Sequence, residues 1–192
     1  MSINPDKLQT IYLISIVCWW FLETWIIARE LGDVNKSKDQ STRKYVVMGI
    51  FTAIGAGILC SKLPFGKIGI NSSVRFITAI IFIWTGLIVR WRAVVTLGRF
   101  FRSTVMIQKD HKLITGGLYK YVRHPSYTGV VLMLLGTGIG LGNWLGLFLI
   151  PMIGLLGIAR RIKVEEDELI NSLGKEYKDY MKNTFRLIPL IY

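Results

Sequence analysis

Two apolar runs near the C-terminus decide the fold: residues 123–160 read RHPSYTGVVLMLLGTGIGLGNWLGLFLIPMIGLLGIAR. Each run approaches the roughly 20 mostly apolar residues that a helix needs to cross a bilayer. His124-Pro125 predicts the start of the first helix, because proline is tolerated at the first helical position. The Gly142-Asn143 pair alone separates the runs. We therefore expect a tight antiparallel hairpin that returns Arg161 to the membrane face from which Tyr127 departs.

Hydropathy places the rest of the chain in the membrane as well. The 192 residues are 52% hydrophobic, with a mean hydropathy of +0.43, which is too apolar for an ordinary soluble domain. Five apolar blocks approach the length of a span, at roughly 8–28, 45–62, 74–90, 126–142 and 144–160. We therefore predict an all-α integral membrane protein with about five transmembrane helices. Residues 1–7 lack the charged start of a cleavable signal peptide, so we expect the first span to be retained.

The positive charge is concentrated on one side of these spans. The net charge is +12, and 20 of the 24 Lys and Arg residues fall in three segments, 29–44, 90–124 and the tail from Arg160. Basic residues gather in the cytoplasmic loops of membrane proteins. We therefore expect these three segments to be cytoplasmic, with the N-terminus outside and the C-terminus inside. Since this distribution accounts for the charge, we expect no nucleic-acid binding.

The sequence gives little support for a metal or dinucleotide site. The chain has 2 Cys and 2 His without ligand-like spacing, so no metal site is expected. Both cysteines lie in apolar blocks, where a small buried side chain is the simplest interpretation. The pairs Gly136/Gly140 and Gly138/Gly142 have the small-x3-small spacing of closely packed membrane helices, and we expect them to bring the two helices of the hairpin together. They complete no Gly-x-Gly-x-x-Gly pattern after a strand.

Charged residues within or beside the apolar runs are the candidates for chemistry. A carboxylate inside the membrane is a functional candidate, but Glu23 lies near the cytoplasmic end of its run, where it can reach the interface or Arg29. We do not assign it to the site. Beyond the hairpin, Arg161 and Glu165 are four residues apart and share a helix face; an ordinary surface pair of this kind contributes about 0.5 kcal/mol or less. They lie at the end of the hairpin, facing the His124-Pro125 helix start, and we favour a functional role for them mainly because the surrounding motifs resemble those of a known family.

The ordered set of motifs in the C-terminal half resembles a known family. Arg-His-Pro-Ser-Tyr-x-Gly from residue 123, a hydrophobic hairpin, Arg-x3-Glu-Glu-x2-Leu-Ile-x2-Leu-Gly-x-Glu-Tyr-x2-Tyr from residue 161 and a closing Ile188-Pro189 are similar to the C-terminal half of isoprenylcysteine carboxyl methyltransferases. The resemblance covers about residues 98–192, and the length is similar to that of a short prokaryotic member of archaeal type. It implies one membrane methyltransferase domain over 1–192, with three spans in 1–97 and the cofactor and catalytic half in 98–192.

The resemblance also implies S-adenosylmethionine as the cofactor, with S-adenosylhomocysteine as its product, in a pocket that faces the cytoplasm. By their positions in the motifs, the residues expected to bind the cofactor are Gln108, His111, Lys112, Leu113, Ile114, Tyr119, His124, Pro125, Ser126, Tyr127 and Glu165. The spacing around Gln108 differs from the family pattern by a few residues. Arg161 matches the substrate-binding arginine of the family, so Arg161 and Glu165 are the expected catalytic residues.

The implied reaction is transfer of a methyl group to the carboxylate of a lipophilic, prenylcysteine-like substrate drawn from the bilayer. An ionised carboxylate needs no general base, and a planar arginine is suited to hold it with two donors. Two alternatives stay open on similar motifs, a phospholipid N-methyltransferase and a sterol-type reductase that uses NADPH. A small transporter or scaffold would bind no cofactor at all. The acceptor also stays open between a prenylcysteine peptide and another isoprenoid carboxylate.

Overall fold

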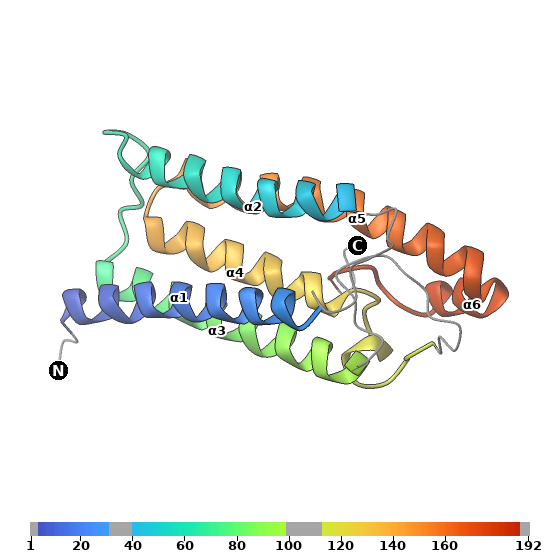
Figure 1. Ribbon diagram of the computed structural model, residues 1–192. Helices are drawn as coiled ribbons and strands as arrows, with labels where there is room; N and C mark the ends of the chain where they lie inside the picture. Colours follow the sequence, from blue (N-terminus) through green and yellow to red (C-terminus); the bar gives the residue numbers. More distant parts are fainter. Residues whose placement is uncertain (1–3, 31–39, 99–112, 189–192) are drawn as a thin grey trace.

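Five long helices run lengthwise in a bundle, and the shorter elements gather at one end of it (Figure 1). The computed structural model describes residues 4–30, 40–98 and 113–188, with the backbone alone for 27–30 and 40–44. The elements are α1 (Pro5–Glu30), α2 (Gln40–Ser61), α3 (Ser72–Leu97), the 3-10 turn η3 (Gly117–Lys120), α4 (Pro125–Leu141), α5 (Trp144–Leu173) and α6 (Lys175–Lys182). Over the described ranges β-pairing is limited to two isolated bridges, so the predicted all-α class is confirmed.

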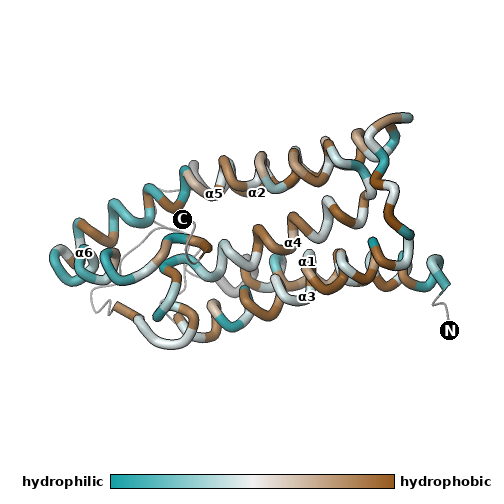
Figure 2. The backbone as a smooth tube through the Cα atoms, turned by 180° about the vertical axis from the view of Figure 1, so that it is seen from behind, coloured by the Kyte–Doolittle hydropathy of each residue, from teal (hydrophilic) through white to brown (hydrophobic). Residues whose placement is uncertain are grey.

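Three of these helices are long and apolar enough to cross a membrane: α1 over Pro5–Ile26, α3 and α5. The apolar parts of α2 and α4, Tyr45–Ser61 and Pro125–Leu141, are shorter, so their crossing of the bilayer stays a prediction. Large apolar side chains face outward along the bundle, for example Phe21 at 74% and Leu156 at 68% exposure. Figure 2 shows the apolar colouring along the middle of the helices and polar colouring around α6. This pattern is that of helices surrounded by lipid.

Helix α4 contacts all four of the other long helices, and its most extensive contact is with α3. Two glycines let these helices touch through their backbones: a Cβ built on Gly86 would lie 2.5 Å from the carbonyl oxygen of Gly129. The prediction that glycines bring α4 against α5 is correct for Gly138, which faces Leu147. It is wrong for Gly136 and Gly142, which face α3, and for Gly140, which faces Tyr12 of α1. The 3.6-residue period of the helix turns alternate glycines toward different neighbours.

The predicted hairpin between α4 and α5 is confirmed. Gly142 ends α4 with a left-handed φ of 71°, which favours glycine. Asn143 begins α5: its side-chain oxygen accepts from the backbone N–H of Leu145 at 2.9 Å, and its amide nitrogen donates to the carbonyl oxygen of Phe65 at 3.0 Å. The α4–α5 turn is thereby fixed to the loop between α2 and α3.

Helix α5 continues without a break through Leu173, well beyond the apolar block that was expected to end near residue 160. Residues 158–173 contain no glycine or proline to stop the helix. The helix ends at Gly174, whose φ is 56°. The continuous helix extends the hairpin beyond its apolar part and places Arg161 and Glu165 rigidly at the end of the bundle.

Candidate active site

The candidate site lies at the end of the bundle where α4 begins and α6 is found (Figure 1). Three parts of the chain contribute. The first is the start of α4, the second is the polar part of α5, and the third is the segment 184–187 that follows α6. The first two come from the motifs singled out in the sequence, and the third holds them in place.

The start of α4 is fixed by backbone pairing with the C-terminal segment. The backbone N–H of Arg123 donates to the carbonyl oxygen of Phe185 at 2.8 Å, and the N–H of His124 donates to that of Arg186 at 3.1 Å. The Thr128 hydroxyl donates to the carbonyl oxygen of Leu187 at 2.6 Å. Pro125 is the first residue of α4, as predicted, and His124 precedes it as the N-cap. The backbone at His124 is therefore held in place by the C-terminal segment.

Glu165 lies at the centre of one hydrogen-bonded cluster. Its Oε1 accepts from the Tyr127 hydroxyl at 2.5 Å and from Arg161 Nε at 2.9 Å, while its Oε2 lies 3.5 Å from His124 Nδ1. Arg161 Nε also donates to the Tyr127 hydroxyl oxygen at 2.8 Å. The side chain of Glu165 is 18% exposed and that of Arg161 only 4%. Since a carboxylate has about four acceptor positions, Glu165 retains capacity for a further cationic partner.

Glu166 lies at the centre of a second, more deeply buried cluster. Its Oε1 accepts from Arg123 Nε at 2.8 Å and lies 3.2 Å from His124 Nε2, and its Oε2 lies 2.8 Å from Arg186 Nη2. The side chain of Glu166 is 4% exposed. Arg123 also donates to the carbonyl oxygens of Met181 and Thr184. Glu166 thus ties α5 to both the start of α4 and the C-terminal segment.

His124 connects the two clusters, because its two ring nitrogens face the two neighbouring carboxylates. Burial lowers the pKa of this imidazole, but its hydrogen bonds with Glu165 and Glu166 and their negative charges outweigh that effect, so the pKa is raised above the ordinary value of 6.5. The protonated ring donates from both nitrogens, which matches two acceptors on opposite sides.

Ser126 belongs to a different network. Its hydroxyl accepts from Arg90 Nη1 at 2.6 Å, and Arg90 pairs with Glu23, with Nη2 donating to Oε2 at 2.6 Å. Trp19 Nε1 donates to the other carboxylate oxygen of Glu23 at 3.2 Å. From the sequence, Glu23 was assigned no role and was expected to reach either the interface or Arg29. The structure pairs it with Arg90 of another helix. The sequence did contain a signal for this pair: Glu23 and Arg90 are opposite charges within apolar runs, and charges buried in membranes are usually paired.

The remaining predicted cofactor residues lie on the segment before α4 or outside the described ranges. Tyr119 is buried; its hydroxyl donates to the carbonyl oxygen of Ala93 in α3 at 3.4 Å, and its own carbonyl oxygen accepts from Tyr180 at 2.6 Å. The end of the connection that precedes α4 therefore packs against the bundle. Leu113 and Ile114 are half-buried at the start of this segment. The positions expected to bind cofactor that lie outside the described residues are Gln108, His111 and Lys112.

Comparisons with known proteins agree with the motifs. Residues 78–171 match the family model described as the isoprenylcysteine carboxyl methyltransferase family. The protein-S-isoprenylcysteine O-methyltransferase of Schizosaccharomyces pombe is 37% identical over 136 residues, which is 70% of this chain and 58% of that protein. The enzyme of the same name from Dictyostelium discoideum is 39% identical over 109 residues, or 56% of this chain and 46% of that protein. The chain therefore spans about half the length of these relatives.

A solved structure has the same fold over the whole chain. It is that of a eukaryotic intramembrane Ras methyltransferase, an isoprenylcysteine carboxyl methyltransferase. The superposition has a TM-score of 0.69 at 20% sequence identity, and covers 100% of this chain and 70% of the other. The fold likeness thus extends to the N-terminal helices, in which the sequence showed no motif.

Proposed function

Because residues 78–171 match the model of the isoprenylcysteine carboxyl methyltransferase family, we propose that the chain is a member of this family. In this proposal it transfers a methyl group from S-adenosylmethionine to the carboxylate of a lipophilic, prenylcysteine-like substrate at the membrane. The observation that carries the proposal is the cluster of Tyr127, Arg161 and Glu165 at the end of the α4–α5 hairpin. It combines an arginine and a carboxylate where an apolar bundle meets a polar surface.

The charged side chains of the site are complementary to the cofactor. S-adenosylmethionine carries an ammonium and a sulfonium, and it supplies a methyl group on the positively charged sulfur. The negative charge of Glu165 can attract these cations, because its three neighbours leave an acceptor position of the carboxylate unoccupied. Tyr127 and His124 orient its carboxylate from the start of α4. Glu166, in contrast, is surrounded by Arg123, Arg186 and His124, so we assign the cofactor contact to Glu165.

Arg161 is assigned to the acceptor carboxylate. Its side chain is 4% exposed. In such a buried, low-dielectric site the planar pair of N–H donors of a guanidinium, its fork, holds a carboxylate more firmly than in water. Its Nε–H faces Tyr127 and Glu165, which fixes the plane of the fork. The proposed arrangement places the negative acceptor beside Arg161 and the positive donor beside Glu165, one helical turn apart.

Positioning and exclusion of water supply the catalysis in this proposal. A carboxylate is already ionised at neutral pH, so no side chain needs to remove a proton. The chain holds the acceptor oxygen near the methyl donor, and such positioning can supply several kcal/mol of the barrier. Burial keeps water out of the reaction. The apolar substrate reaches the site from the bilayer, and the cofactor reaches it from the cytoplasmic side.

Calorimetry and one activity assay test this proposal. The purified protein should bind S-adenosylhomocysteine and not NADPH, and it should methylate a prenylcysteine in preference to a phosphatidylethanolamine amine. Glu168→Gln, an exposed position on the same helix, should behave as the wild type and serves as the control. Binding of NADPH would favour a reductase, and methylation of the amine alone would favour a phospholipid N-methyltransferase. Binding of neither cofactor would remove the enzymatic proposal.

A further inference from the structure

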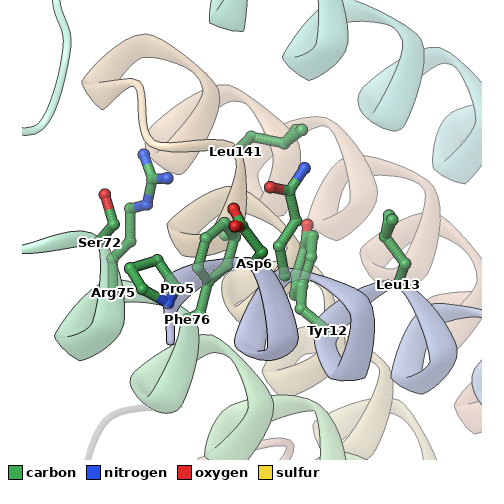
Figure 3. Close-up of a pocket in the computed structure, with 10 residues that line it drawn as sticks. Pro5, Asp6, Tyr12, Leu13, Ser72, Arg75, Phe76 and Leu141 are labelled. Atoms are coloured by element: carbon green, nitrogen blue, oxygen red, sulfur yellow. The ribbon is translucent and has the colours of Figure 1, made fainter. Parts of the chain in front are cut away.

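A second polar cavity lies at the end of the bundle opposite the candidate active site. It has a volume of about 400 Å³ and opens between the first turns of α1 and α3 and the last turn of α4 (Figure 3). Its walls include Asp6, Tyr12 and Leu13 from α1, Arg75 and Phe76 from α3, and Leu141 from α4. Because α1 and α3 are long enough to span the membrane, their first turns lie at the depth of lipid headgroups.

Arg75 is the cation of this cavity. Its Nε is buried and has no hydrogen-bond partner in the described part of the chain. The guanidinium lies over the Phe76 ring, 4.8 Å from the centroid, and Figure 3 shows it extending toward the end of α4. A Cβ on Gly142 would overlap it. Since an unsatisfied buried donor is costly, this arginine is suited to an anionic ligand that enters the cavity.

A carboxylate faces the same cavity without neutralising the arginine. Asp6 lines it from α1, yet no ion pair joins Asp6 and Arg75 in the described ranges. The Tyr12 hydroxyl donates to the carbonyl oxygen of Thr137 at 3.1 Å, so Tyr12 forms a wall and is not a free donor. One positive and one negative group, held apart around one cavity, are complementary to a zwitterion.

The apolar wall of the cavity continues down the outside of the bundle. Leu13, which lines the cavity, is 52% exposed, and Val17 and Phe21 follow it at 65% and 74%. Residues spaced by four lie on one face of a helix, so these side chains form one exposed apolar track on α1. A ligand with a charged head in the cavity can lay an acyl chain along this track, which a free inorganic anion cannot do.

We propose that this cavity binds the headgroup of a zwitterionic phospholipid, with the phosphate at Arg75 and the ammonium at Asp6. The site is separate from the chemistry at the other end of the bundle. It would hold a structural lipid where the first turns of α1 and α3 meet the end of α4. Its occupancy therefore affects the stability of the bundle and does not require the proposed methyl transfer.

Thermal unfolding of the full chain in a non-ionic detergent tests the proposal. Added dioctanoylphosphatidylethanolamine should raise the unfolding midpoint in a saturable way, while dioctanoylglycerol, which has the same tails without the phosphate, should not. Arg75→Gln should raise the lipid concentration needed for half of the shift by about tenfold or more, because a hydrogen bond to a charged group is lost. Lys62→Gln, an exposed cation outside the cavity lining, should leave it unchanged.

Two further comparisons separate the possible ligands. Asp6→Asn should reduce the preference for phosphatidylethanolamine over phosphatidylglycerol, and an unchanged preference would overturn the ammonium contact. An equal shift with sodium phosphate alone would mean a free anion site, and an equal shift with dioctanoylglycerol would mean an apolar groove. If Arg75→Gln does not fold, Arg75→Lys replaces it: this variant keeps the charge without the planar fork, and lipid binding as tight as that of the wild type would reject the phosphate contact.

Discussion

Glu165→Gln and Glu166→Gln should affect different properties of the protein, the first cofactor binding and the second fold stability. The two variants carry the same change in charge and size at consecutive positions of α5. Glu165 is partly exposed, and Tyr127, Arg161 and His124 surround it. Glu166 is 4% exposed and is the shared partner of two arginines and the same histidine. We expect Glu165→Gln to weaken cofactor binding and Glu166→Gln to destabilise the fold.

The magnitudes follow from burial and pairing. Removing one partner of a buried ion pair costs about 3–5 kcal/mol, because the other charge stays buried without compensation. Glu166→Gln leaves Arg123 buried without this counter-charge, since the Arg123 side chain is only 8% exposed. For a chain of this size, about 1 kcal/mol corresponds to roughly 2–4 °C in the unfolding midpoint, so we expect a decrease of about 6–20 °C. For Glu165→Gln we expect a loss of about 2 kcal/mol in cofactor affinity, or roughly 30-fold.

Two measurements on the same detergent-solubilised samples distinguish these outcomes. The unfolding midpoint is followed by circular dichroism, and the affinity for S-adenosylhomocysteine by calorimetry, with Glu168→Gln as the matched exposed control. The reasoning is refuted if Glu166→Gln unfolds within about 2 °C of the wild type. An unchanged cofactor affinity in Glu165→Gln, together with a large loss in a folded Glu166→Gln, would mean that the roles are reversed.

Three further predictions concern the same end of the molecule. Arg161→Lys keeps the charge beside Glu165 but loses the planar fork, so kcat/KM for a prenylcysteine should fall by roughly 30-fold or more with near-normal S-adenosylhomocysteine affinity; an equal loss of that affinity would show that the pair acts as one unit. The raised pKa of His124 stabilises the fold fully below pH 6.5 and loses this effect as the pH rises through the folded-state pKa. The midpoint advantage of the wild type over His124→Gln should therefore shrink with increasing pH, and a constant difference would contradict this. In a cysteine-free background, Lys175→Cys should react with an impermeant reagent only from the cytoplasmic side, and labelling from outside would reverse the topology.

The features that could be predicted from the sequence are those set by local chemistry. The helix start at Pro125 and the turn at Gly142 depend on residues with special backbone preferences. The pairing of Arg161 with Glu165 follows from their spacing within one helix. In each case the residues that determine the feature are only a few positions apart in the sequence.

The features that could not be predicted depend on contacts between distant segments. Arg90 is 67 residues from Glu23 in the sequence and 36 from Ser126, and no periodicity relates these positions. The backbone pairing of residues 121–124 with 185–186 is likewise a tertiary contact. The glycines of α4 showed that close packing occurs, but only the arrangement of the bundle decides which neighbour each one faces. The division of labour between Glu165 and Glu166 depends on that same arrangement.

Consecutive positions on a helix point in directions about 100° apart, so Glu165 and Glu166 face different neighbours although they are adjacent in the sequence. His124 lies between them and contacts both, while its own backbone N–H is bound to the C-terminal segment. The same segment supplies Arg186 to Glu166. A displacement of this segment would therefore act on Glu165 through the His124 imidazole. The buried Glu166 cluster can in this way set the geometry of the more exposed Glu165 cluster, where the proposed chemistry takes place.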